Sequence, residues 1–119
     1  MSTASKPLPS DLSYAFESLK NSLVVRLRGR ASFDQTPVLD RCFKAIEGHT
    51  EPRVVLELSE LSYIGSAGLG AFITLRHAVE ARHAHIVLVG LNPMVYDLFE
   101  TSGLTQVFTV FKTLAEAVT

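Results

Sequence analysis

The sequence predicts a single α/β domain, in which helices pack on a mixed β-sheet in the order β-β-α-β-α-β-α-β(-α). Short runs of aliphatic and β-branched residues alternate with longer segments whose apolar residues recur at helical spacing. The chain has 119 residues, of which 47% are hydrophobic and 19% charged, and this size and composition suit one globular domain. Because strands and helices alternate after the first two strands, we expect the later part of the sheet to be parallel.

Residues 1–12 are mostly small and polar and contain prolines, so we expect a flexible tail before a domain of residues 13–119. The sequence shows no apolar run typical of a signal peptide, and none long enough to span a bilayer. The net charge of −1 and the pI near 6.4 favour neither a nucleic-acid groove nor an anionic membrane. We therefore expect a cytoplasmic protein without a nucleic-acid or membrane partner.

The first two strands are predicted to form a hairpin. Residues 14–19 and 23–28 have strand-like patterns, and Lys20 and Asn21 between them are typical of a turn. We expect Gly29 to end the hairpin and residues 30–35 to form a loop.

The first helix is predicted to start with Thr36 as N-cap and Pro37 at the first helical position. Apolar residues at i, i+3, i+4 and i+7 give it one buried face: Leu39, Cys42, Phe43 and Ile46. Gly48 ends it. Cys42 is the only cysteine, so no internal disulfide forms and we expect a buried, inert thiol.

The second half of the chain continues the alternation. We predict a central strand at residues 53–58, followed by a loop at 59–65 and a helix at 69–82. A further strand is predicted at 86–89, a last strand at 107–111 and a short final helix at 114–118. A third helix is capped by Asn92 and Pro93 and stopped by Gly103. In parallel sheets, functional loops lie beyond the carboxyl ends of the strands. Two predicted loops lie there, residues 29–35 and 59–68, and they are the candidate functional loops.

Ser66 is the most informative residue of the second loop. Gly65, Gly68 and Gly70 surround it, although a glycine inside a helix costs about 1 kcal/mol. This cost indicates a need either for open backbone geometry or for the close approach of another group. Ser66 is predicted to be an N-cap, where free N–H groups favour an anion and would tolerate a phosphoryl group of about −2 charge. On local grounds, an ordinary cap and a regulatory serine both fit.

Residues 61–70, between the strand at 54–58 and the helix at 69–82, resemble the signature of the STAS domain, the fold of bacterial anti-anti-sigma factors. That signature is roughly aspartate-serine-serine/threonine-glycine-leucine-glycine after an apolar pair, and residues 64–70 (IGSAGLG) take its place. The resemblance covers about residues 14–118. It includes the hairpin glycine and a late pattern: Gly29, Pro93, Leu98, Phe99, Ser102, Gly103 and Leu104.

The resemblance implies an anti-sigma factor antagonist rather than an enzyme. In that family, the unphosphorylated antagonist binds an anti-sigma factor of serine-kinase type, and the sigma factor is released. The kinase then phosphorylates the signature serine, here Ser66, which breaks the complex, and a phosphatase restores it. The implied partner-binding residues are Ser32, Asp34, Gly65, Ser66, Ala67, Gly68, Leu69 and Gly70.

The site is less acidic than the family pattern. Gly65 stands where aspartate is usual, and Ala67 replaces the second hydroxyl residue. Ser32 occupies roughly the place of an acidic residue in the first loop, with Asp34 two residues on, and Glu57 stands where the central strand often ends in aspartate.

The sequence does not match the motifs of a serine nucleophile, a dinucleotide-binding loop or a metal site. A nucleophile elbow needs a glycine two residues before the serine, where this chain has Ile64, and the glycine spacing does not match a dinucleotide-binding loop. His83 and His85 lack further metal ligands, and His49 and His77 have no evident partners. We expect no metal and no cofactor.

Arg76, Glu80 and Arg82 are predicted to form the solvated face of the second helix. Two alternatives to the antagonist stay open: a non-switching scaffold subunit of a signalling assembly, and a STAS domain that senses a small molecule or nucleotide. The sequence also leaves open the oligomeric state, the sigma factor and the pathway.

Overall fold

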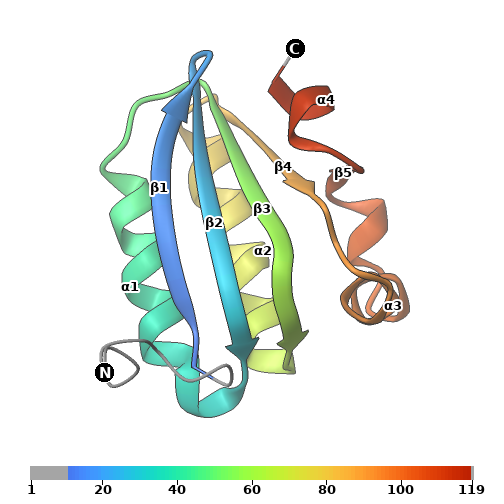
Figure 1. Ribbon diagram of the computed structural model, residues 1–119. Coiled ribbons are helices and arrows are strands. Elements are labelled where there is room, and N and C mark those ends of the chain that lie inside the picture. The colour runs from blue at the N-terminus through green and yellow to red at the C-terminus, as the bar shows by residue number, and fades with distance from the viewer. Residues whose placement is uncertain (1–10, 119) are drawn as a thin grey trace, which may run out of the picture.

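The fold is built on a five-stranded sheet in the order β1-β2-β3-β4-β5 (Figure 1). The computed structural model describes residues 11–118, so most of the expected tail, residues 1–10, lies outside the described residues. The strands are β1 (Ser13–Leu19), β2 (Ser22–Ala31), β3 (Arg53–Ile64), β4 (His85–Val89) and β5 (Thr109–Phe111). β1 is antiparallel to β2 and the other pairs are parallel, which confirms the predicted mixed sheet.

Within residues 11–118, four helices complete the predicted order: α1 (Thr36–Glu47), α2 (Ser66–Ala81), α3 (Pro93–Thr101) and α4 (Leu114–Val118). Two short 3₁₀ turns, η2 (Phe33–Gln35) and η3 (Leu104–Gln106), precede α1 and β5. Figure 1 shows α1 and α2 side by side against one face of the sheet, with α3 beyond the carboxyl end of β4. The order β-β-α-β-α-β-α-β-α is therefore confirmed.

The main core lies between the sheet and the helices α1, α2 and α3. The rings of Phe72 and Phe99 meet edge to face with their centroids 5.5 Å apart, and Phe43 packs on Phe72 in the same way at 5.2 Å. Leu12, at the end of the expected tail, is buried in this core, and its N–H donates to Gln35 Oε1 at 3.0 Å. A smaller cluster on the other face of the sheet is covered by α4: Val24, Val55, Val87, Val89, Ala117 and Val118.

The hairpin forms as predicted, but Gly29 does not end it. Lys20 and Asn21 have φ of 51° and 65°, the left-handed pair that a tight two-residue turn requires. β2 continues to Ala31. Gly29 has φ of 102°, and a Cβ on it would lie 1.8 Å from the carbonyl oxygen of Asp11, so only glycine lets the chain enter β1 here.

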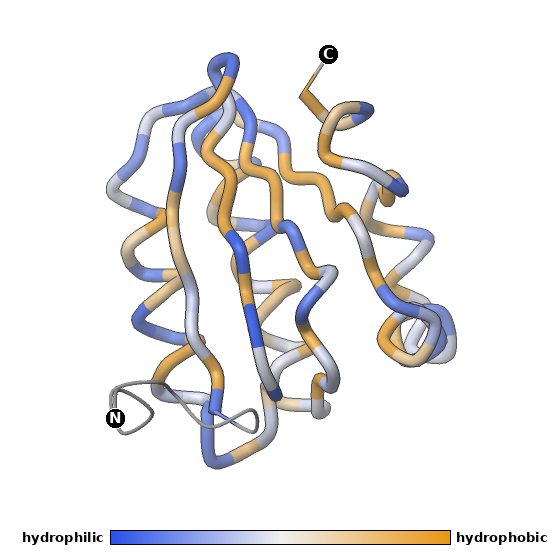
Figure 2. The backbone as a smooth tube through the Cα atoms, viewed as in Figure 1, coloured by the Kyte–Doolittle hydropathy of each residue, from blue (hydrophilic) through white to orange (hydrophobic). Residues whose placement is uncertain are grey.

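β3 is longer than predicted, because it continues through the expected loop to Ile64. Beyond Glu57 it pairs only with β2, since β4 ends at Val89. On the side that β4 leaves open, Asn92 Nδ2 donates to the carbonyl oxygen of Leu61 at 2.7 Å. Figure 2 shows that the strands are hydrophobic in the half near α4 and more hydrophilic toward the carboxyl ends of β2 and β3.

The helix ends differ little from the predictions. Gln35, not Thr36, is the N-cap of α1, and Gly48 ends that helix as expected. α2 begins at Ser66, three residues earlier than predicted. The side chain of Asn92 caps α3 by accepting from the N–H of Val95 at 2.9 Å, and Gly103 follows α3 with φ of 77°. The last strand begins only at Thr109 because η3 precedes it.

Candidate functional site

The two predicted loops lie together at the carboxyl ends of β2 and β3 (Figure 1). The last paired residues of these strands are Ala31 and Ile64, which stand opposite each other. The N–H of Gly65 donates to the carbonyl oxygen of Ala31 at 3.0 Å, and η2 packs against α2. Since the strands are parallel neighbours, the turn after β2 (Ser32 to Gln35) and the start of α2 after β3 (from Gly65) lie side by side. We call this end of the sheet the rim.

Ser66 is exposed on this rim as the first residue of α2. The N-cap is Gly65, with φ −92° and ψ 177° and no side chain to cap the helix, so the predicted cap position was wrong by one residue. The first intrahelical bond runs from the N–H of Leu69 to the carbonyl oxygen of Gly65, at 2.9 Å. The N–H groups before Leu69 therefore have no partner within the helix, and they make this end electropositive.

The Ser66 hydroxyl has no hydrogen-bond partner among residues 11–118. It is thus a solvated hydroxyl beside free backbone N–H groups, rather than a serine used in local capping. No hydrogen bond within residues 11–118 has to break when a group is transferred to Ser66 Oγ, and a negative charge there is favoured by the helix end.

The three glycines of the junction have different environments. A Cβ on Gly68 would lie 2.8 Å from Cγ1 of the buried Ile64, so glycine is what lets α2 approach the end of β3. A Cβ on Gly65 would make only ordinary contacts of 3.6 Å or more, and one on Gly70 would have nothing within 4 Å. The predicted close approach is therefore confirmed at Gly68 alone.

The predicted contact residues of α2 are not equally accessible. Ser66, Ala67 and Gly70 are exposed, whereas Gly68 is buried and Leu69 packs partly against the main core. Only the exposed residues present a side chain or open backbone to a partner, and the contact role of the whole set stays a prediction.

Ser32 and Asp34 are engaged inside the turn that follows β2. Ser32 Oγ donates to Asp34 Oδ1 at 2.7 Å, and Gln35 Nε2 lies 3.4 Å from Asp34 Oδ2. The Ser32 hydroxyl, and next the Gln35 amide, hold the pKa of Asp34 below its usual value. Thr36 Oγ1 donates to the carbonyl oxygen of Phe33 at 2.7 Å, which closes the turn.

The same turn displays an aromatic residue that sequence reasoning did not select. Phe33 is 83% exposed at the tip of η2. The only signal in the sequence is an aromatic side chain between the polar residues Ser32 and Asp34 in a predicted loop, and this pattern does not reveal which way the ring points.

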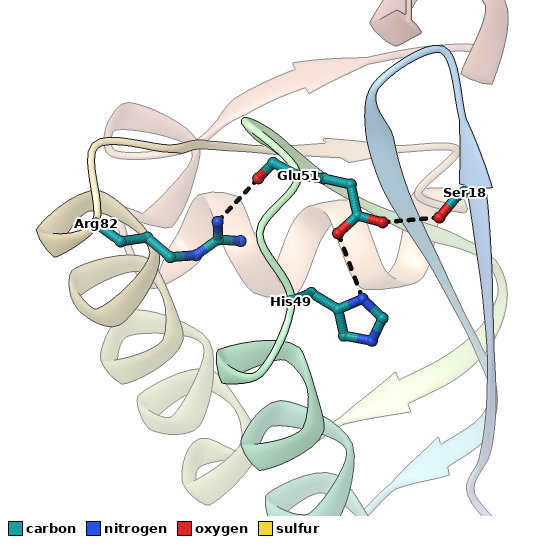
Figure 3. Close-up of polar contacts among 4 residues, drawn as sticks. All are labelled: Ser18, His49, Glu51 and Arg82. Atoms are coloured by element: carbon teal, nitrogen blue, oxygen red, sulfur yellow. Dashed lines mark hydrogen bonds and ion pairs between the residues drawn. The ribbon is translucent and has the colours of Figure 1, made fainter.

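A second polar cluster lies at the opposite end of the sheet and joins three elements (Figure 3). Glu51 accepts a hydrogen bond from Ser18 Oγ at 2.7 Å, and His49 Nδ1 lies 3.3 Å from its other carboxylate oxygen. Arg82 Nη1 donates to the carbonyl oxygen of Glu51 at 2.9 Å. The predictions that His49 lacks a partner and that Arg82 lies on a solvated face were therefore wrong.

This cluster does not form a nucleophilic site. The Ser18 hydroxyl bonds to a carboxylate rather than to the imidazole, so no histidine base stands beside it. The hydroxyl instead stabilises the ionised carboxylate and lowers the pKa of Glu51. The cluster ties the β1–β2 hairpin and the end of α2 to the segment that enters β3.

The remaining candidates have structural surroundings. Cys42 is buried, as expected, and desolvation raises the pKa of its thiol to about 12. His83 and His85 are exposed, and the part of the chain that the structure describes holds no group of three or more His, Cys, Asp or Glu placed to bind a metal. None of the helices within residues 11–118 is long and apolar enough to cross a membrane.

Comparison with known proteins agrees with this architecture. The STAS domain family model matches residues 14–117. The putative anti-sigma factor antagonist BtrV of Bordetella bronchiseptica is 31% identical over 94 residues, which are 79% of this chain and 81% of BtrV.

Solved structures show the same fold. An anti-sigma factor antagonist from Mycobacterium paratuberculosis has a TM-score of 0.84 at 22% identity, covering 93% of this chain and 94% of its own. The anti-sigma factor antagonist SpoIIAA in its unphosphorylated form gives 0.72 at 22% identity, covering 89% and 93%. Bacillus SpoIIAA in its phosphorylated form gives 0.65 at 19% identity, covering 89% and 96%.

Proposed function

This chain belongs to the STAS domain family, and we propose that it is an anti-sigma factor antagonist that is switched off by phosphorylation of Ser66. The unphosphorylated chain binds an anti-sigma factor of serine-kinase type in the cytoplasm, so that a sigma factor is released. A phosphatase reverses the modification. The observation that carries this proposal is the exposed Ser66 hydroxyl, which has no hydrogen bond within residues 11–118, on the rim formed by the ends of β2 and β3.

The relatives support the first part of the proposal. BtrV is named a putative antagonist, and SpoIIAA is an antagonist with an unphosphorylated and a phosphorylated form. The chain itself needs no catalytic group, because the partner kinase performs the chemistry. The γ-phosphoryl group of ATP is transferred to Ser66 Oγ, the bond to ADP breaks, and the hydroxyl proton leaves with a base of the kinase.

The start of α2 explains why the modified chain would stay folded. A phosphoserine adds about −2 charge beside N–H groups that have no intrahelical partner, and this placement stabilises an anion. The penalty falls on the complex instead, since the dianion has to be desolvated or repelled by the surface that covers it.

The reduced acidity of the site has no steric cause at Gly65. An aspartate Cβ at this position would make contacts no shorter than 3.6 Å, and φ of −92° is open to any residue. The structure would thus accept the acidic residue of the family pattern, and its absence leaves the modification of Ser66 as the source of negative charge at this point of the rim.

Binding measurements with the GHKL-type anti-sigma factor from the same genome test this function. Wild type, Ser66→Ala and Thr50→Asp are expected to bind with Kd values within about threefold of one another, whereas Ser66→Asp weakens binding at least about tenfold. Thr50→Asp is the matched control, because Thr50 is exposed at the opposite end of the sheet and receives the same charge. Equal binding by Ser66→Asp would remove the switch, and no binding by any variant would contradict the partner class.

A further inference from the structure

We propose that Phe33 is the apolar anchor of the complex, inserting into an apolar pocket on the anti-sigma factor next to the Ser66 contact. The inference rests on the proposed function and specifies the chemistry of the partner surface. It assigns a contact residue that the family signature does not contain.

Phe33 is exposed to an unusual degree for an aromatic side chain. Its exposure of 83% exceeds that of every other exposed large hydrophobic residue in the described part of the chain, the next being Met94 at 61%. Exposed aromatic side chains at the centre of a binding surface are typical energetic anchors of protein interfaces.

The backbone that carries Phe33 is held in place before any partner binds. Its carbonyl oxygen accepts from Thr36 Oγ1 at 2.7 Å, and the N–H of Gln35 donates to the carbonyl oxygen of Ser32 at 2.9 Å. The Gln35 side chain in turn holds the N–H of the buried Leu12. Because the turn is already ordered, inserting the ring into a pocket costs less conformational entropy than ordering a loose loop.

The charged groups around Phe33 are already engaged within the chain. Asp34 accepts from Ser32 and lies beside the amide of Gln35, and the Arg30 guanidinium carbon stacks 4.5 Å from the centroid of the Tyr63 ring. The first ten residues of α2, 66–75, contain no charged residue at all. A partner surface that covers the start of α2 therefore meets no charged side chain there, whereas Asp34 remains an exposed carboxylate beside Phe33.

Two further apolar side chains are exposed on the helices that follow β3 and β4. Ile73 on α2 is 38% exposed, and Met94 lies in the first turn of α3, directly after β4. Phe33, Ser66 and Met94 thus follow three neighbouring parallel strands, although β4 ends opposite Glu57 while β3 continues to Ile64.

The apolar anchor also explains how a site of low acidity can be switched. The part of the partner surface that covers the Phe33 ring is apolar and offers no hydrogen bonds or cations to a phosphoryl group on the neighbouring Ser66. Burial of a charge without such partners is strongly unfavourable, so a phosphate on Ser66 prevents closure over the ring.

Isothermal titration of the purified GHKL-type anti-sigma factor tests the anchor. Phe33→Ala is expected to raise Kd about 30-fold, which is the size of an interface hot spot. The matched control Val107→Ala removes an exposed apolar side chain next to β5 and leaves Kd within about threefold. The wild-type Kd is expected to change less than about threefold between about 0.05 M and about 0.5 M salt, since apolar contacts are not screened. The melting temperature of Phe33→Ala is expected to equal that of the wild type, because the ring is exposed.

The outcomes separate this inference from the proposed function. If the wild type binds the anti-sigma factor and Phe33→Ala binds it with a Kd within about threefold of the wild type, the anchor is wrong and the proposed function still stands. A wild-type Kd that rises more than about tenfold with salt likewise overturns it, in favour of charged contacts. Absence of any wild-type complex contradicts the proposed function and the anchor together.

Discussion

At the scale of single residues, Gly68 and Gly70 lie two positions apart on α2, and replacing each by alanine is expected to change the free energy of unfolding in opposite directions. Gly68→Ala places a methyl group 2.8 Å from Cγ1 of the buried Ile64, and such overpacking is expected to lower the free energy of unfolding by about 1–3 kcal/mol. Gly70→Ala meets nothing within 4 Å and is expected to raise it by about 0.5–1 kcal/mol, because alanine is the better helix former.

Urea unfolding of both variants checks this pair, and each variant serves as the control for the other. Two shifts of the same sign would show that the environments of the two glycines are not those described.

The exact role of each residue at the Ser66 junction could be predicted only in part. Serine and glycine are both good N-caps, so the sequence does not decide between Ser66 and Gly65, and the choice depends on the backbone hydrogen bond from Gly65 to Ala31. Phe33 could not be selected at all, because its exposure follows from how Ser32, Asp34 and Thr36 close the turn.

At the scale of elements, the hydrogen bond between Ser18 and Glu51 joins the hairpin to the entry of β3 (Figure 3). This bond lowers the pKa of Glu51 in the folded chain. A carboxyl group with a lowered folded pKa contributes stability above its unfolded pKa, near 4.3, and loses that contribution as the pH falls through the folded pKa. Ser18→Ala is therefore expected to be less stable than the wild type near neutral pH, by a difference that shrinks at acidic pH.

Urea unfolding at about pH 7 and about pH 3 measures this difference. Ser102→Ala, which removes an exposed hydroxyl elsewhere, is the control and is expected to show no such dependence. A Ser18→Ala deficit that is the same at both pH values would contradict the role given to this bond.

The elements themselves were largely predictable, and the exceptions share a physical cause. Residues 53–58 show the continuous apolar run of a strand buried on both faces, whereas the rest of β3 pairs only with β2 and carries Ser59, Glu60 and Ser62. The pairing of β2 with β3 also shifts register twice between Arg26 and Arg30, which breaks the two-residue alternation. Because of these polar residues and bulges, the sequence pattern does not identify the carboxyl halves of β2 and β3 as strand. These halves carry the candidate site.

At the scale of the whole molecule, the two ends of the sheet have different tasks. At one end, Glu51 connects three elements by hydrogen bonds: its carboxylate accepts from Ser18 of the hairpin, and its carbonyl oxygen accepts from Arg82 at the end of α2 (Figure 3). The opposite rim presents the Ser66 hydroxyl, which has no hydrogen-bond partner in the described part of the chain, and the exposed ring of Phe33. The order of the elements predicted this rim as the place of function, because parallel strands bring their carboxyl ends to one edge.

Ser66 is the residue through which we propose that partner binding by this chain is switched. Phosphopeptide mapping by mass spectrometry, on the chain purified from its native cells, tests it most directly, with Ser66→Ala as control. We expect one phosphate, on Ser66, in the fraction that does not bind the anti-sigma factor, and none in Ser66→Ala. A phosphate on another residue instead, or an unmodified Ser66 under every growth condition, would contradict it.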